Sequence, residues 1–129
     1  MDIQKVGMVI HPVEDLDAAA RFYRETLWLR ELFRDGDRFC AFDAKGVTIA
    51  LAAGDEAVAS APAVSYKVAD LDSAIDELVA GGASLVRPAS AGRHEVRALL
   101  RDPAGNAFIV YAGGRPRRAA DRLDAVSRS

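Results

Sequence analysis

Length, composition and charge exclude several classes of protein. The chain has 129 residues, 50% of them hydrophobic, and a formal net charge of -2 at pH 7, which suits one globular domain with a buried core. Because basic residues are not concentrated before residue 115, we expect no nucleic-acid partner. No apolar run approaches the ~20 residues that a membrane-spanning helix needs, and the single cysteine, Cys40, fits a reducing cytoplasm.

The first half of the chain predicts a strand, a helix and three further strands. Residues 5–10 are apolar and β-branched, as in a strand, and Asp15 can cap the helix that follows. Three- and four-residue spacing gives that helix an apolar stripe, consisting of Ala18, Ala19, Phe22, Tyr23 and Leu27. Short strands are predicted over 31–33, 38–42 and 47–52, with turns at 34–37 and 43–46.

The second half repeats this order. The segment VEDLD at 13–17 returns as VADLD at 68–72, and the turn DAKG at 43–46 returns as DPAG at 102–105. Strands are predicted over 64–68, 85–86, 95–100 and 106–111, and a helix over 72–79 that Gly81 and Gly82 stop. The chain is therefore predicted to be an α+β protein made of two tandem βαβββ modules.

These motifs resemble the glyoxalase/bleomycin-resistance/extradiol-dioxygenase superfamily, also called vicinal oxygen chelate proteins. The resemblance rests on VEDL at 13–16, the Phe22-Tyr23 pair and DPAGN at 102–106, and it covers residues 3–112. It implies a glyoxalase-like fold in which each module is a curved mixed sheet around a cleft, with its helix outside. We accordingly expect one domain over 1–112 with modules 1–56 and 61–112, a charged tail over 113–129, and a homodimer.

The chain departs from this family at the positions that bind the metal ion. Family members bind a divalent ion through positions on the first and last strands of each module, which correspond here to Met8, Ala50, Ala63 and Ile109. None of these side chains can coordinate a hard divalent ion. We therefore expect no metal and no cofactor. Metal-dependent lyase or dioxygenase activity is an alternative only if these positions are wrongly assigned.

Without a metal ion, the resemblance still implies a cleft. If the four former metal positions point inward, period-two alternation selects the lining of the cleft. This set of candidate ligand-binding residues is Met8, Arg38, Cys40, Phe42, Thr48, Ala50, Ala63, Ser65, Lys67, Arg97, Leu99, Ile109 and Tyr111. An apolar wall with arginines suits a flat or apolar molecule that carries a carboxylate or phenolate.

Three side chains have other expected roles. Cys40 is expected to be a packing residue and not a nucleophile, and His11 is expected to be a polar residue at a strand end. Trp28 stands where the family commonly has glycine, and it is expected to pack against a sheet edge or a dimer surface.

Two classes of function follow. The first is a metal-independent protein that binds a small molecule in the cleft without transforming it. The second is a metal-independent isomerase, lyase or cyclase that uses His94, Glu95, Arg97 or Tyr111 as acid, base or oxyanion partner. A third possibility is a protein whose dimer surface is its whole purpose.

Overall fold

The computed structural model describes residues 1–92 and 94–114, so the expected tail lies outside the described residues from position 115 onward. The chain forms two compact units. The first is Gly7–Ser65, and the second combines Met1–Val6 with the chain from Tyr66. None of the described helices is long and apolar enough to cross a membrane.

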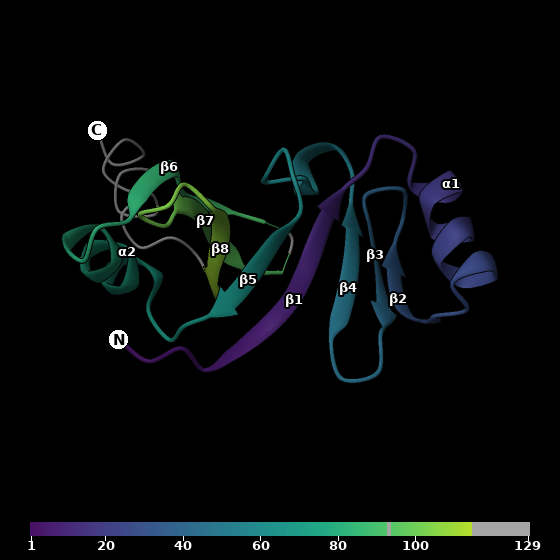
Figure 1. Ribbon diagram of the computed structural model, residues 1–129, viewed down its shortest axis with the longest axis horizontal. Coiled ribbons are helices and arrows are strands. Elements are labelled where there is room, and N and C mark those ends of the chain that lie inside the picture. Colours follow the sequence, from purple (N-terminus) through teal and green to yellow (C-terminus); the bar gives the residue numbers. More distant parts are fainter. Residues whose placement is uncertain (93, 115–129) are drawn as a thin grey trace, which may run out of the picture. The chain divides into compact units, whose positions relative to one another are not determined.

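In the first unit, four strands accompany a helical segment (Figure 1). Its elements are β1 (Lys5–Pro12, from Gly7 on), α1 (Leu16–Arg21), the π-helical turn η1 (Phe22–Thr26), β2 (Arg30–Asp35), β3 (Phe39–Asp43), β4 (Thr48–Ala52) and the 3₁₀ turn η2 (Gly54–Glu56). The strand order is β2-β3-β4-β1. Strand β4 is parallel to β1, whereas β3 is antiparallel to both β2 and β4.

The second unit repeats this order. Its elements are β5 (Ala63–Lys67, from Tyr66 on), α2 (Leu71–Ala80), β6 (Ser84–Ala91), β7 (Val96–Arg101) and β8 (Ala107–Ala112). The strand order is β5-β8-β7-β6. Strand β6 is much longer than the predicted 85–86. It contains Pro88, and proline is uncommon within strands. A proline is tolerated here since β6 is last in the order and its pairing with β7 is irregular between Arg87 and Ser90.

Both helices begin with the same cap, as expected for two copies of one unit. Asp15 Oδ1 accepts a hydrogen bond from Ala18 N at 3.1 Å, and Asp70 Oδ1 accepts one from Ser73 N at 3.3 Å. Helix α2 ends at Gly81, and the next residue, Gly82, has a positive φ of 114°. The predicted glycine stop of this helix is confirmed.

The two aspartate turns are also equivalent. Asp43 Oδ1 accepts from Lys45 N, and Asp102 Oδ1 accepts from Ala104 N, each at 2.9 Å. The Lys45 amide and the Arg30 guanidinium lower the pKa of Asp43, and hydrogen bonds from Asn106 lower that of Asp102. In both modules the carboxylate thus holds the turn before the last strand.

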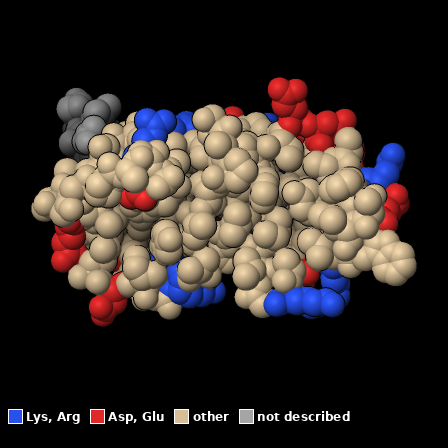
Figure 2. All heavy atoms as spheres, in the orientation of Figure 1, with Lys and Arg blue, Asp and Glu red and all other residues tan. Residues whose placement is uncertain are grey.

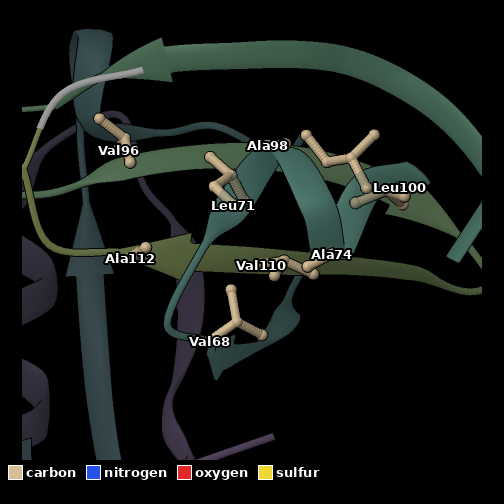
Figure 3. Packing of buried hydrophobic residues seen from close by; sticks show 9 residues of the cluster. Val68, Leu71, Ala74, Val96, Ala98, Leu100, Val110 and Ala112 are labelled. Atoms are coloured by element: carbon tan, nitrogen blue, oxygen red, sulfur yellow. The ribbon is translucent and has the colours of Figure 1, made fainter. Parts of the chain in front are cut away.

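The core of the second unit lies between α2 and one face of the β7–β8 pair (Figure 3). Strand residues at alternate positions meet the apolar side of the helix, and the cluster comprises Val68, Leu71, Ala74, Ile75, Val96, Ala98, Leu100, Val110 and Ala112. Along β7 and β8 these core residues alternate with Arg97, Leu99, Ile109 and Tyr111, which were predicted to face the cleft.

The core of the first unit corrects the sequence reading. Leu16 and Ala20 of α1 pack in one cluster with Cys40, Phe42 and Leu51. The expectation that Cys40 and Phe42 line a cleft is therefore wrong, because both face the helix. Residues 39–42 are all apolar, so the sequence of β3 has no polar alternation to fix which face turns inward.

The pairing of β3 with β4 shows which residues lie on the face where Cys40 and Phe42 were expected. Ala41 lies opposite Ala50, and Phe39 lies opposite Ala52, on the face away from α1. Arg38 precedes β3, and its guanidinium lies 3.6 Å from Asp37 and 3.3 Å from Asp55 in the adjoining turns. Its predicted place on the inner face of β3 is wrong as well.

Candidate functional site

Four predicted ligand-binding residues share one face of the second unit. In the antiparallel pairing of β7 with β8, Arg97 lies opposite Tyr111 and Leu99 lies opposite Ile109. Their strand neighbours Ala98 and Val110 belong to the core beneath α2. The four side chains consequently point away from that core, as the alternation predicted.

Arg97 is the unusual member of this group. Its exposed fraction is 7%, and it is one of two buried polar residues among those described, with Ser65. Its Nη1 donates to Glu95 Oε1 at 3.4 Å, a long ion pair whose carboxylate is partly exposed. Since a buried guanidinium is costly unless charges and hydrogen bonds compensate it, the carboxylate of Glu95 is part of what allows Arg97 to be buried.

Gly92 allows the β6–β7 loop to approach Arg97. A Cβ atom added at Gly92 would lie 2.4 Å from Arg97 Nη1, so a side chain at this position would force the guanidinium to move. The Gly92 amide donates to the Glu95 carbonyl at 2.7 Å and so holds the loop in this place. Sequence reasoning missed Gly92, because its role depends on a contact and not on a local turn signal.

Tyr111 adds a hydroxyl group to the same face. Burial, and then the negative charge of Glu95, raise the pKa of the Tyr111 phenol above its ordinary value. The phenol is therefore protonated at neutral pH and can donate a hydrogen bond. The structure thus groups Glu95, Arg97 and Tyr111, whereas His94 is exposed.

In the first unit, Met8 and Ser65 contact each other. Met8 N donates to Ser65 Oγ at 3.1 Å, and that hydroxyl donates to the Met8 carbonyl at 3.2 Å. These bonds explain how a serine can be buried there. They also engage the hydroxyl that the sequence offered as a ligand contact.

The remaining candidates differ in exposure. Met8, Thr48 and Lys67 are half-buried, whereas the small or apolar side chains of Ala50, Ala63, Leu99 and Ile109 are buried. A ligand that touches the buried ones must displace the atoms that cover them. Tyr111 and Glu95, which lie beside Arg97, are half-buried.

The positions that correspond to the metal ligands of the family carry no coordinating side chain. Met8 and Ala50 lie on the parallel strands β1 and β4, where Ala50 pairs with Ile10. Within residues 1–92 and 94–114, no group of three or more His, Cys, Asp or Glu side chains could hold a metal ion.

Cys40 has the surroundings of a packing residue. It is fully buried, and its Sγ lies 3.3 Å from Glu31 Oε1. Burial and this carboxylate raise the pKa of the thiol to about 12. A thiol of this kind is protonated at neutral pH and is a poor nucleophile.

The structure also places His11 and Trp28. His11 lies at the end of β1 with its ring centroid 6.2 Å from that of Tyr23. Trp28 has a positive φ of 60°, so glycine would indeed suit its backbone. However, its exposed fraction is 84%, so the expectation that it packs against a sheet edge of its own chain is wrong.

Comparison with known proteins identifies the family. Residues 7–111 match the family model of the glyoxalase-like domain, so the chain belongs to this family. The resemblance inferred from the repeated motifs is confirmed. An uncharacterized protein of Mycolicibacterium smegmatis is 37% identical over 113 residues, which cover 87% of this chain and 97% of that protein.

Solved structures agree on the fold. The Mycobacterium tuberculosis methylmalonyl-CoA epimerase is 21% identical, with a TM-score of 0.61 over 92% of this chain and 93% of its own. A Legionella pneumophila structure described as an NAD-dependent benzaldehyde dehydrogenase is 18% identical, with a TM-score of 0.71 over 83% of this chain and 98% of its own. At this identity the likeness shows the fold alone.

Proposed function

We propose that this protein binds a small, largely apolar molecule through an anionic group, without a metal ion or cofactor. The observation that carries the proposal is the buried guanidinium of Arg97 beside Leu99, Ile109 and Tyr111 on one strand face. Guanidinium binds a carboxylate through two parallel hydrogen bonds, and the neighbouring side chains favour an apolar body. We also propose that the protein acts in the cytoplasm as a homodimer.

Glu95 sets the energetics of this binding. Its carboxylate neutralises Arg97 across 3.4 Å in the absence of a ligand, while its own side chain remains partly exposed. An incoming carboxylate can take over the guanidinium and release Glu95 to water. Both states keep the charge of Arg97 compensated, which a buried cation requires.

Matched acids and amides test the proposal. Benzoate and 2-naphthoate are compared with benzamide and 2-naphthamide by thermal denaturation, because a ligand that binds the native state raises the melting temperature. We expect the acids to raise it and the amides to have little effect. A melting temperature that no acid moves, or that acids and amides move equally, contradicts an anionic ligand at this site.

Two variants locate the binding. Arg97→Gln should abolish the shift, and Arg97→Lys should retain part of it through the charge. Arg101→Gln is the matched control, because Arg101 is on the same strand but exposed, and it should bind normally. Circular dichroism verifies that each variant is folded. A shift retained in folded Arg97→Gln would refute the assignment.

A metal-independent enzyme is the second candidate. It is favoured by the protonated phenol of Tyr111 and the carboxylate of Glu95 near Arg97, which could serve as acid, base and oxyanion partner. The fold shared with an enzyme described as an epimerase supports the same class. Proton NMR of the ethyl thioester of 2-phenylpropanoic acid in D₂O would reveal exchange of the α-proton, which Glu95→Gln should abolish.

A further inference from the structure

Strand β2 has an exposed apolar edge. It is the terminal strand in the order of the first unit, and α1 packs over β3 and β4. Leu32 and Phe33, at the middle of β2, have exposed fractions of 44% and 45%. The 84%-exposed Trp28 lies two residues before the strand. A terminal strand offers backbone groups to another strand, so this edge is suited to a protein partner.

The charges of β2 are complementary to themselves. The strand reads Arg-Glu-Leu-Phe-Arg-Asp over Arg30–Asp35. In an antiparallel pairing centred on the middle of β2, Arg30 lies opposite Asp35 of the partner subunit. Glu31 then lies opposite Arg34 of the partner subunit, so each charged position meets its opposite sign.

An irregularity in β2 makes this register geometrically consistent. Residues 30 and 35 of a regular strand would lie on opposite faces, because side chains alternate. The pairing with β3 shifts between Glu31 and Phe33, so that Arg30 and Asp35 both pair with the face of Asp43 and Phe39. Glu31 and Arg34 lie opposite Phe42 and Cys40, which face α1.

Contacts within the chain support these orientations. Arg30 reaches Asp43 at 3.1 Å on one face, while Arg34 pairs with Asp17 of α1 on the other. Residues directly opposite in an antiparallel pair share a face, and a two-fold axis normal to the sheet preserves that face. Both charged pairs of this register satisfy this requirement.

We propose that β2 pairs antiparallel with β2 of a second copy of this chain, about a two-fold axis near Phe33. Backbone hydrogen bonds and the exposed side chains of Leu32 and Phe33 hold the two strands together, and the charged pairs fix the register. Trp28 lies at the border of this interface. The 84%-exposed Trp28 thereby gains a partner.

Disulfide trapping tests the register. In Arg30→Cys/Asp35→Cys, each new thiol faces the other position of the partner subunit, whereas the two thiols of one chain lie too far apart along the strand to react. We expect oxidation to give a covalent dimer from the double variant and not from either single variant. A double variant that stays monomeric under oxidation overturns the register.

Charge exchange tests the interface in the reduced protein. Arg30→Glu and Asp35→Lys each place like charges opposite one another twice, so we expect sedimentation velocity to show about tenfold weaker association. The combined Arg30→Glu/Asp35→Lys variant restores opposite charges and should recover the association. Val86→Glu, on the exposed part of β6, is the control and should associate normally.

The single tryptophan provides an independent signal. Emission from Trp28 should move to shorter wavelength as the native protein associates, and it should follow the sedimentation data. A protein that remains monomeric at the highest soluble concentration, or singles that associate as tightly as the native chain, would overturn the proposal. So would failure of the double exchange to restore the dimer while all variants remain folded.

Discussion

Individual side chains in this protein take their chemistry from the face on which the fold places them. Arg97 and Cys40 are both buried, yet the first retains a charge beside Glu95 and the second has a thiol whose pKa is raised to about 12. The difference follows from the strand face, because Arg97 points away from its helix and Cys40 points toward α1. Burial therefore leaves a charged group on one strand face and a neutral packing group on the other.

The thiol of Cys40 makes one prediction at this scale. Iodoacetamide reacts with thiolates, and a thiol with a pKa of about 12 has few of them at about pH 8. We expect alkylation of the native protein to be slower than that of the unfolded chain by orders of magnitude. Mass spectrometry of samples quenched over time, with and without guanidinium chloride, measures both rates; equal rates would mean that Cys40 is accessible.

The helix caps and the aspartate turns repeat along with the helices and strands. Asp15 and Asp70 cap the two helices, and Asp43 and Asp102 hold the two turns before the last strands. Each carboxylate accepts a hydrogen bond from a backbone amide that would otherwise require water. The repeat visible in the sequence is thus a repeat of local hydrogen bonding.

Asp102 gives the prediction for the turns. Hydrogen bonds from Asn106 lower its pKa in the folded protein, so the ionised carboxylate stabilises the fold above the unfolded pKa, and this contribution is lost as the pH falls. We expect Asp102→Ala to lower the melting temperature at pH 7. The difference from the native protein should shrink below about pH 4, where the carboxylate becomes protonated.

Melting curves across this pH range measure the effect. Glu25→Gln, which neutralises an exposed carboxylate of the π-helical turn, is the control and should change the melting temperature little at either pH. A difference for Asp102→Ala that is independent of pH would show that the charge of Asp102 has no part in holding the turn.

At the scale of the whole molecule, most charged side chains lie at the surface and apolar side chains form the core. On the face drawn in Figure 2, positive and negative side chains both lie mostly along the margins, and the surface between them is largely uncharged. Each unit has its own apolar cluster next to its helix. The second cluster, with Leu100 fully buried in it, offers a clear test of how much stability the packing supplies.

Leu100→Ala should lower the free energy of unfolding by about 2 to 5 kcal/mol, because it removes a buried side chain and leaves a cavity. Val86→Ala, in an exposed part of β6, is the matched control and should change it by less than about 1 kcal/mol. Unfolding by guanidinium chloride, followed by circular dichroism, measures both. Similar losses for the two variants would contradict the packing described for α2 and β7.

The sequence predicted the order of elements, the Asp15 cap of α1, the glycine stop of α2 and the face of β7 and β8, because each leaves a local pattern. It did not predict the face of β3, since four consecutive apolar residues carry no alternation, and it shortened β6 because of Pro88. At the candidate site it identified Arg97 and Tyr111 but not Gly92. Contacts between a loop and a strand depend on the folded path of the chain, which no local pattern records.

Gly92 couples the β6–β7 loop to the side chain of Arg97. A Cβ atom at position 92 would lie 2.4 Å from Arg97 Nη1, so a larger residue there requires the guanidinium to move. In related chains, a larger residue at position 92 should therefore accompany a different placement of the side chain at position 97, or a different residue there.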